Sequence, residues 1–186
     1  MFPLSAPAMT SPYAAGSRSI VDRMRGAALL DVATYEEVEH DTNATGQAAV
    51  VVALAAIAAA VGNVFRSGPG LVGGLVGYLV GWALWSGIIY LVGTRVFGGT
   101  ATWGEVLRTF GFAQAPGLLL VAGFVPLLGG LLQFAVSIWV AIAGFIAIRQ
   151  ALDLPTGKTL LTVLLGWVAS IVVYGLAGRL LGVGIR

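Results

Sequence analysis

The longest stretch of the sequence without a charged residue is "TFGFAQAPGLLLVAGFVPLLGGLLQFAVSIWVAIAGFIAI", residues 109–148. An α-helix rises 1.5 Å per residue, so about 20 apolar residues cross the hydrocarbon core of a bilayer. The stretch has roughly twice that length. The segment "VPLLGG", residues 125–130, supplies a proline and two glycines that would interrupt a helix near its middle. The stretch therefore predicts two consecutive transmembrane helices.

Three other stretches of 20 or more residues lack Asp, Glu, Lys and Arg: residues 46–65, 67–94 and 159–178. Over the whole chain, 58% of the residues are hydrophobic and 10% are charged, against about 45–50% and 25% in soluble domains. We expect the first span at about 46–65, the second at 71–93 and the fifth at 159–181. The third begins near 103 and the fourth ends at 149, with the break at 125–130 between them. The predicted fold class is all-α: a polytopic membrane protein with five transmembrane helices and a short amphipathic helical region before them.

The chain divides into three parts by composition. Residues 1–19 hold three prolines and no Lys or Arg before Arg18, and we expect a disordered cytoplasmic tail. Residues 20–45 hold apolar side chains at helical spacing with charges between them, which indicates a cytoplasmic or interfacial helical segment whose arginines reach the headgroups. Within it, the T-x-x-E spacing of Thr34 and Glu37 predicts the start of a second short helix. Residues 46–186 form the five-helix transmembrane domain.

The distribution of basic residues predicts the topology. With the N-terminus inside, the cytoplasmic segments would hold seven basic residues and the outside three. The seven are Arg18, Arg23, Arg25, Arg95, Arg108, Arg149 and Lys158, and the three are Arg66, Arg179 and Arg186. Cytoplasmic segments carry the excess of Lys and Arg, so we expect a multi-pass protein of the cell (inner or cytoplasmic) membrane with the N-terminus inside and the C-terminus outside. Arg108 and Arg149 would anchor their spans at the interface.

A glycine stripe marks the second predicted span. Gly73, Gly77 and Gly81 are four residues apart and share one helix face. Small residues at this spacing let transmembrane helices approach closely. Helix packing within the chain is the favoured interpretation, and a homodimer contact is the alternative.

The motif "GFAQAP", residues 111–116, interrupts the apolar character of the third predicted span. The capping-box spacing of Thr102 and Glu105 places the start of that helix near Trp103, so Pro116 would be an interior proline. It would kink the helix and leave the carbonyl of Phe112 unbonded, which a membrane tolerates only where the defect faces protein or a polar cavity. Gly111, Gln114 and Pro116 are therefore the candidate intramembrane motif, as a packing element rather than a ligand site.

Three segments together resemble bacterial members of the Yip domain family, the Ypt/Rab-interacting polytopic membrane proteins. They are "RMRGAALLDVATYEEVEHDTNATGQA" (23–48), "GTRVFGGTATWGEVLRTFGFAQAPGLL" (93–119) and "IRQALDLPTGKTLLTVLLGW" (148–167). Gly111 to Pro116 matches the family's Gly-aromatic-x-x-x-Pro feature. The resemblance implies five helices and a cytoplasmic N-terminus. Eukaryotic members are linked to Rab GTPases and vesicle traffic, but this chain has "LLDVATYEEVEHD" in place of their Asp-Leu-Tyr-Gly-Pro motif, so Rab binding is not implied.

The composition argues against several function classes. The chain has no cysteine, its single histidine, His40, lies outside the predicted spans, and its basic residues form no nucleic-acid patch. We therefore expect no enzyme activity, no catalytic residue, no cofactor and no nucleic-acid partner. Glu36, Glu37, Glu39, His40 and Asp41 could hold a divalent cation. Consecutive acids on a helix point in different directions, however, so a solvated face without a metal is expected.

Two functions remain open. The favoured one is a non-catalytic, membrane-organising or partner-binding protein, whose partners are membrane lipids and other membrane or cytoplasmic proteins. The alternative is a small transporter or lipid-handling protein that works through Gln114 and Pro116. The polar residues of the spans discriminate the two, because transport needs several of them around one lumen and packing needs only pairs. They are Gln47, Asn63, Gln114, Gln133, Ser137, Ser170 and Tyr174.

Overall fold

The computed structural model describes residues 18–63, 71–125 and 128–180, and every regular element in these ranges is helical. The order is α1 (Ile20–Ala28), α2 (Val32–His40), α3 (Ala44–Gly62), α5 (Leu71–Phe97), α6 (Trp103–Phe112), the 3₁₀-helix η1 (Ala115–Phe124), α7 (Leu128–Ala151) and α8 (Thr156–Leu180). Most of the predicted tail, residues 1–17, lies outside the described residues.

The predicted all-α polytopic fold is confirmed. Helices α3, α5, α7 and α8 are each long and apolar enough to cross a membrane. Helices α6 and η1 meet the same criteria only together, and they are bent by 41° at the break between them. The pair forms a fifth span if it is counted as one, in the place where the sequence predicted the third.

The interruption of this span differs from the prediction. Helix α6 ends at Phe112, and Pro116 lies in the first turn of η1. The expectation that Pro116 is interior to one kinked helix is therefore wrong. Proline suits a first turn because its φ is already helical and its missing N–H would have no partner there. The turn between the helices is closed by backbone hydrogen bonds from Gln114 N to Gly111 O and from Gly117 N to Gln114 O, of 3.2 and 2.8 Å.

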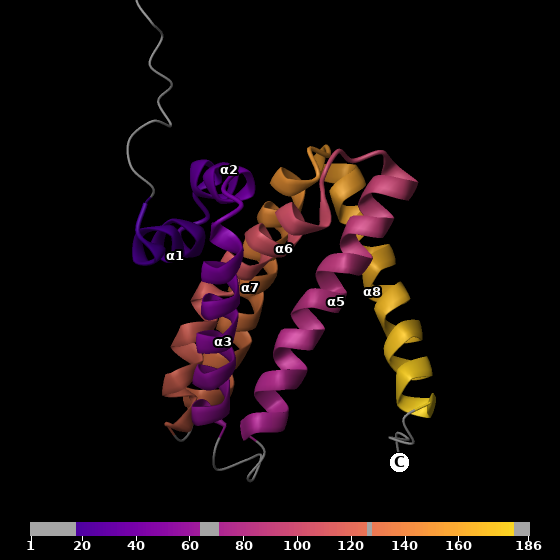
Figure 1. Cartoon of the computed structure of the whole chain (residues 1–186). Helices are drawn as coiled ribbons and strands as arrows, with labels where there is room; N and C mark the ends of the chain where they lie inside the picture. Colours follow the sequence, from indigo (N-terminus) through magenta and orange to yellow (C-terminus); the bar gives the residue numbers. More distant parts are fainter. Residues whose placement is uncertain (1–17, 64–70, 126–127, 181–186) are drawn as a thin grey trace, which may run out of the picture.

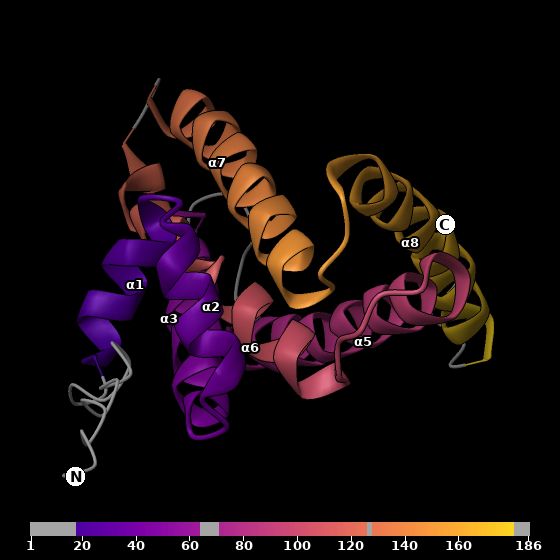
Figure 2. The same cartoon turned by 90° about the horizontal axis from the view of Figure 1, so that it is seen from above.

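The helices form two groups, which meet at α6 and through contacts between α3 and α5. Helix η1 packs against α3 and α7, while α8 packs mainly against α5. Figure 1 shows α5 and α8 close together at their upper ends and apart at their lower ends, with α3 and α7 on the other side of α5. Seen from above, α8 lies beside the part of α5 that is farther from α3 (Figure 2). Helices α1 and α2 lie across the end of the bundle where α6 begins and α7 ends (Figure 1).

The two N-terminal helices are held to each other by ion pairs. Arg23 is 1% exposed and lies 3.0 Å from a carboxylate oxygen of Glu37 and 2.6 Å from one of Asp41. The expectation that this arginine reaches lipid headgroups is therefore wrong, because the acids of α2 lie closer. Helix α2 also begins earlier than predicted, with Asp31 as its N-cap and Thr34 buried inside it. The capping box of Thr102 and Glu105, in contrast, is present as predicted.

Candidate functional site

A cavity of about 600 Å³, open to the surface of the helix bundle, lies between α5, α6, α7 and α8, next to the break before η1. Its volume falls within the range of small-molecule sites, roughly 300–1,000 Å³. Gln114 lies on its wall, in the turn that the end of α6 creates. The interruption predicted from "GFAQAP" therefore places an amide side chain at a cavity between helices.

Polar side chains from three further helices share this cavity. Tyr78 comes from α5, Ser137 from α7, and Ser170 and Tyr174 from α8. Four of the seven polar residues singled out in the predicted spans thus surround one space: Gln114, Ser137, Ser170 and Tyr174. The sequence reasoning expected several polar residues around one lumen for a transporter or lipid-handling protein, and only pairs for a packing role.

The hydrogen bonds of these side chains leave acceptor sites toward the cavity. The hydroxyl of Tyr78 donates to Oε1 of Gln114 at 3.0 Å. Ser137 donates to the carbonyl of Gln133 at 2.7 Å, and Ser170 to that of Trp167 at 2.8 Å. A hydroxyl oxygen that donates its proton still has two lone pairs. The serine hydroxyls can therefore accept hydrogen bonds from a ligand without giving up their own.

Most of the remaining wall is aromatic or small. Trp82, Trp85 and Trp167 line the cavity, and the indole N–H of Trp82 donates to the carbonyl of Leu107 at 3.2 Å. None of the lining residues that the structure describes is Asp, Glu, Lys, Arg or His. A cavity of this composition suits an uncharged ligand with a large apolar part.

The glycines of the predicted motifs have different surroundings. Gly77 and Gly81 line the cavity, and a Cβ atom at Gly77 would have no neighbour within 4 Å. The close packing of another helix that was predicted at this stripe is thus absent at Gly77 among the described residues. The structure does not describe the surroundings of Gly73. At Gly111 a Cβ would lie 2.8 Å from Cβ of Ala48, so this glycine allows α6 to pack closely on α3.

Most of the chain matches the model of a known protein family. The Yip1 domain matches residues 32–178, from the first residue of α2 to the last turns of α8. The chain belongs to the Yip1 domain family. No curated protein and no solved structure gives a match. The protein is thus a multi-pass integral membrane protein with a Yip1 domain.

The Yip1 domain includes α2, and Arg108 of α6 fixes that helix to the transmembrane part. Arg108 is 5% exposed, and its guanidinium donates to the carbonyls of Val38 and Glu39 in the last turn of α2. Cations are favourable there because the last carbonyls of a helix carry partial negative charge. The prediction that Arg108 anchors its span at the membrane interface is therefore corrected, because its guanidinium contacts protein. Arg149, in the last turn of α7, is exposed, and its anchoring role stays a prediction.

Tyr78 and the tryptophans of the Yip1 domain's cavity were not predicted from the sequence. Tyr78 stands directly after Gly77, and a hydroxyl in an apolar span was a signal of the same kind as Gln114. Trp82 and Trp85 gave no such signal, because large aromatic side chains in a span face lipid as often as they face protein.

Proposed function

We propose that this Yip1-domain protein is a non-catalytic, lipid-handling membrane protein that holds part of a neutral lipid in the cavity between α5, α7 and α8. The observation that carries the proposal is the convergence of Gln114, Ser137, Ser170 and Tyr174 on one space. Of the two functions that the sequence leaves open, this convergence favours the second, a transporter or lipid-handling protein. The protein thereby organises the membrane by binding its lipids.

The chemistry of the wall defines the ligand class. Hydroxyl and amide groups match a hydroxyl or ester group, and the indole and phenyl rings match acyl chains. Without a charged side chain on the wall, a phosphate or ammonium headgroup would be desolvated without a partner. An acylglycerol, which is uncharged and has both parts, fits this description.

Lipid can enter directly from the bilayer. Trp167 and Tyr174 of α8 line the cavity yet are 64% and 44% exposed. The face of α8 that borders the cavity therefore continues to the outer surface of the transmembrane part. An acyl chain in the surrounding bilayer reaches the wall without crossing a barrier of water.

Gly77 and Gly74 provide a matched pair of variants for testing the cavity. Both lie in α5 and have no atom within 4 Å of an added Cβ, but only Gly77 lines the cavity. Gly77→Leu should occupy part of the space and reduce binding of a fluorescent diacylglycerol to the protein in detergent. Gly74→Leu should bind as the wild type does. Equal binding by the wild type and both variants would contradict the proposal. If only Gly77→Leu abolished a dimer, the glycine stripe would be assigned to a contact between two copies of the chain.

We also propose the cytoplasmic (inner) membrane of a bacterial cell as the location, with the N-terminus inside and the C-terminus outside. Thr100 donates to Asp153 at 2.7 Å and Lys158 to the carbonyl of Phe97 at 3.3 Å, so the α5–α6 and α7–α8 connections share one end of the bundle. Helices α1 and α2 lie at the same end (Figure 1). This arrangement supports the topology because the basic residues assigned to the inside gather there.

Reporter fusions test this topology. A fusion after residue 40 should report the cytoplasm, and a fusion at the C-terminus should report the opposite side. If both fusions report the same side, α6 and η1 do not together cross the membrane and the proposed topology is overturned.

Partner binding through α1 and α2 is a second candidate function. Val21 of α1, Leu29 directly after it and Val32 of α2 are 67%, 66% and 44% exposed, which favours a docking role for this end of the protein. Crosslinking in cells should join this surface to another membrane or cytoplasmic protein, and Leu29→Ser should abolish the crosslink. An unchanged crosslink in that variant would contradict the assignment of this surface.

A further inference from the structure

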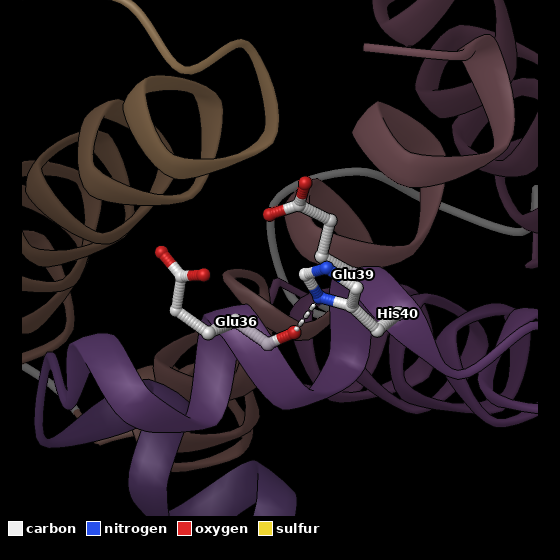
Figure 3. Close-up of side chains that lie close together, drawn as sticks. All are labelled: Glu36, Glu39 and His40. Atoms are coloured by element: carbon white, nitrogen blue, oxygen red, sulfur yellow. Dashed lines mark hydrogen bonds between the residues drawn. The ribbon is translucent and has the colours of Figure 1, made fainter.

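The acidic block of α2 divides into two faces. Helical residues three and four positions apart lie on one face, so Glu36, Glu39 and His40 form one group (Figure 3). Glu37 and Asp41 belong to the other face, where Arg23 pairs with both. The sequence predicted one solvated surface for the whole block. In the structure, the second face pairs with Arg23, whereas the first face carries His40 as its basic residue.

The first group has the composition and spacing of a metal site. One carboxylate oxygen of each glutamate and one ring nitrogen of His40 all lie within 4.8 Å of one another. Ligands about 2.1 Å from a tetrahedral zinc ion are separated by roughly 3.4 Å. The most widely separated of these atoms therefore need to approach one another by up to about 1.4 Å.

Glu39 gives independent support, because its carboxylate lacks a partner. The residue is 8% exposed, and its Oε2 has no hydrogen bond to any residue that the structure describes. A buried carboxylate without a partner is unfavourable. A cation between Glu36 and Glu39 would supply what is missing.

The orientation of His40 is the one that metal-binding histidines adopt. Its Nδ1 lies 2.8 Å from the main-chain carbonyl oxygen of Glu36. A carbonyl can only accept a hydrogen bond, so Nδ1 carries the proton and the lone pair of the neutral ring is on Nε2. Metal-binding histidines commonly donate their other ring N–H to such an acceptor. Gln150 of α7 donates to Glu36 and holds that carboxylate in a similar way.

We propose that Glu36, Glu39 and His40 bind one divalent transition-metal ion of the zinc or manganese class. Two carboxylates and one imidazole suit these ions, and the two negative charges balance the ion's charge. The site lies outside the cavity, and this proposal is independent of lipid handling. Because Gln150 already joins Glu36 to α7, a bound ion would stiffen the contact between the N-terminal helices and the transmembrane part.

Metal titration of the full-length, untagged protein in detergent tests the site. After treatment with a chelator, the wild type should bind one Zn²⁺ or Mn²⁺ per chain in calorimetry and unfold at a higher temperature with the ion present. Glu39→Gln and His40→Ala should each weaken binding by about tenfold or more. Asp22→Asn, which changes an exposed acid of α1, should leave the affinity unchanged.

Three outcomes would overturn the proposal. They are absence of binding of either ion by the wild type, wild-type affinity in His40→Ala, and an equal loss of affinity in Asp22→Asn. His40 is exposed, so its substitution tests the site even if Glu39→Gln fails to fold.

Discussion

The hydroxyl of Tyr78 lies 3.0 Å from Oε1 of Gln114 and joins α5 to the turn between α6 and η1. The two residues are 36 positions apart in the sequence. The bond fixes the amide at the wall of the cavity and connects the two groups of helices.

Removal of this hydrogen bond should have a small effect on stability. Tyr78→Phe and Gln114→Leu should each lower the free energy of unfolding by about 0.6 kcal/mol, the average for hydrogen bonds between transmembrane helices. Unfolding in mixed micelles measures the loss, and the double variant should lose no more than the larger single loss. A loss of several kcal/mol from Tyr78→Phe would show that the hydroxyl has another structural role.

Pro116→Ala should leave the bend between α6 and η1 in place. The proline is in the first turn of η1, and the break is held by main-chain bonds among Gly111, Gln114 and Gly117. The free energy of unfolding should change by less than about 1 kcal/mol, mainly through the greater freedom of the unfolded chain. Spin labels on α6 and η1 would report the bend. A distance that increases to the value for one straight helix would contradict this prediction.

Gly62→Ala should destabilise the protein. A Cβ at Gly62 would overlap the main-chain carbonyl oxygen of Leu120 in η1, so a change of side-chain rotamer cannot relieve the clash. We expect a loss of about 1–3 kcal/mol, as for other overpacked sites. Gly46→Ala in the same helix meets no atom within 4 Å and should be neutral or stabilising by up to about 1 kcal/mol. Thermal unfolding of the two variants side by side tests the close approach of α3 and η1.

Arg23→Met should loosen the N-terminal helices. It would remove hydrogen bonds to Glu37, Asp41 and Gln47 and leave two carboxylates close together. Since both carboxylates keep some contact with solvent, we expect a loss of about 1.5–3 kcal/mol. Arg25→Met, at an exposed position of the same helix, should change stability by less than about 0.5 kcal/mol. Equal protease sensitivity of α1 in the two variants would contradict this role of Arg23.

The sequence predicts those features that depend on neighbouring residues. The spans follow from long apolar stretches, and the start of α6 follows from the spacing of Thr102 and Glu105. Pro116 shows the limit of such local patterns, because a proline inside a kinked helix and one that begins a new helix look alike. Pairing between distant segments is a property of the folded chain. The bonds from Tyr78 to Gln114 and from Arg23 to Asp41 join residues 36 and 18 positions apart, and no local pattern contains them.

The uncharged wall of the cavity has a consequence for energetics. Movement of one elementary charge through the membrane field changes its free energy by about 2.3 kcal/mol per 100 mV. No described lining residue is Asp, Glu, Lys, Arg or His, so entry of an uncharged lipid transfers no charge through that field. Occupancy of the cavity should then be the same in energised and in depolarised cells. It should follow only the concentration of the lipid in the surrounding bilayer.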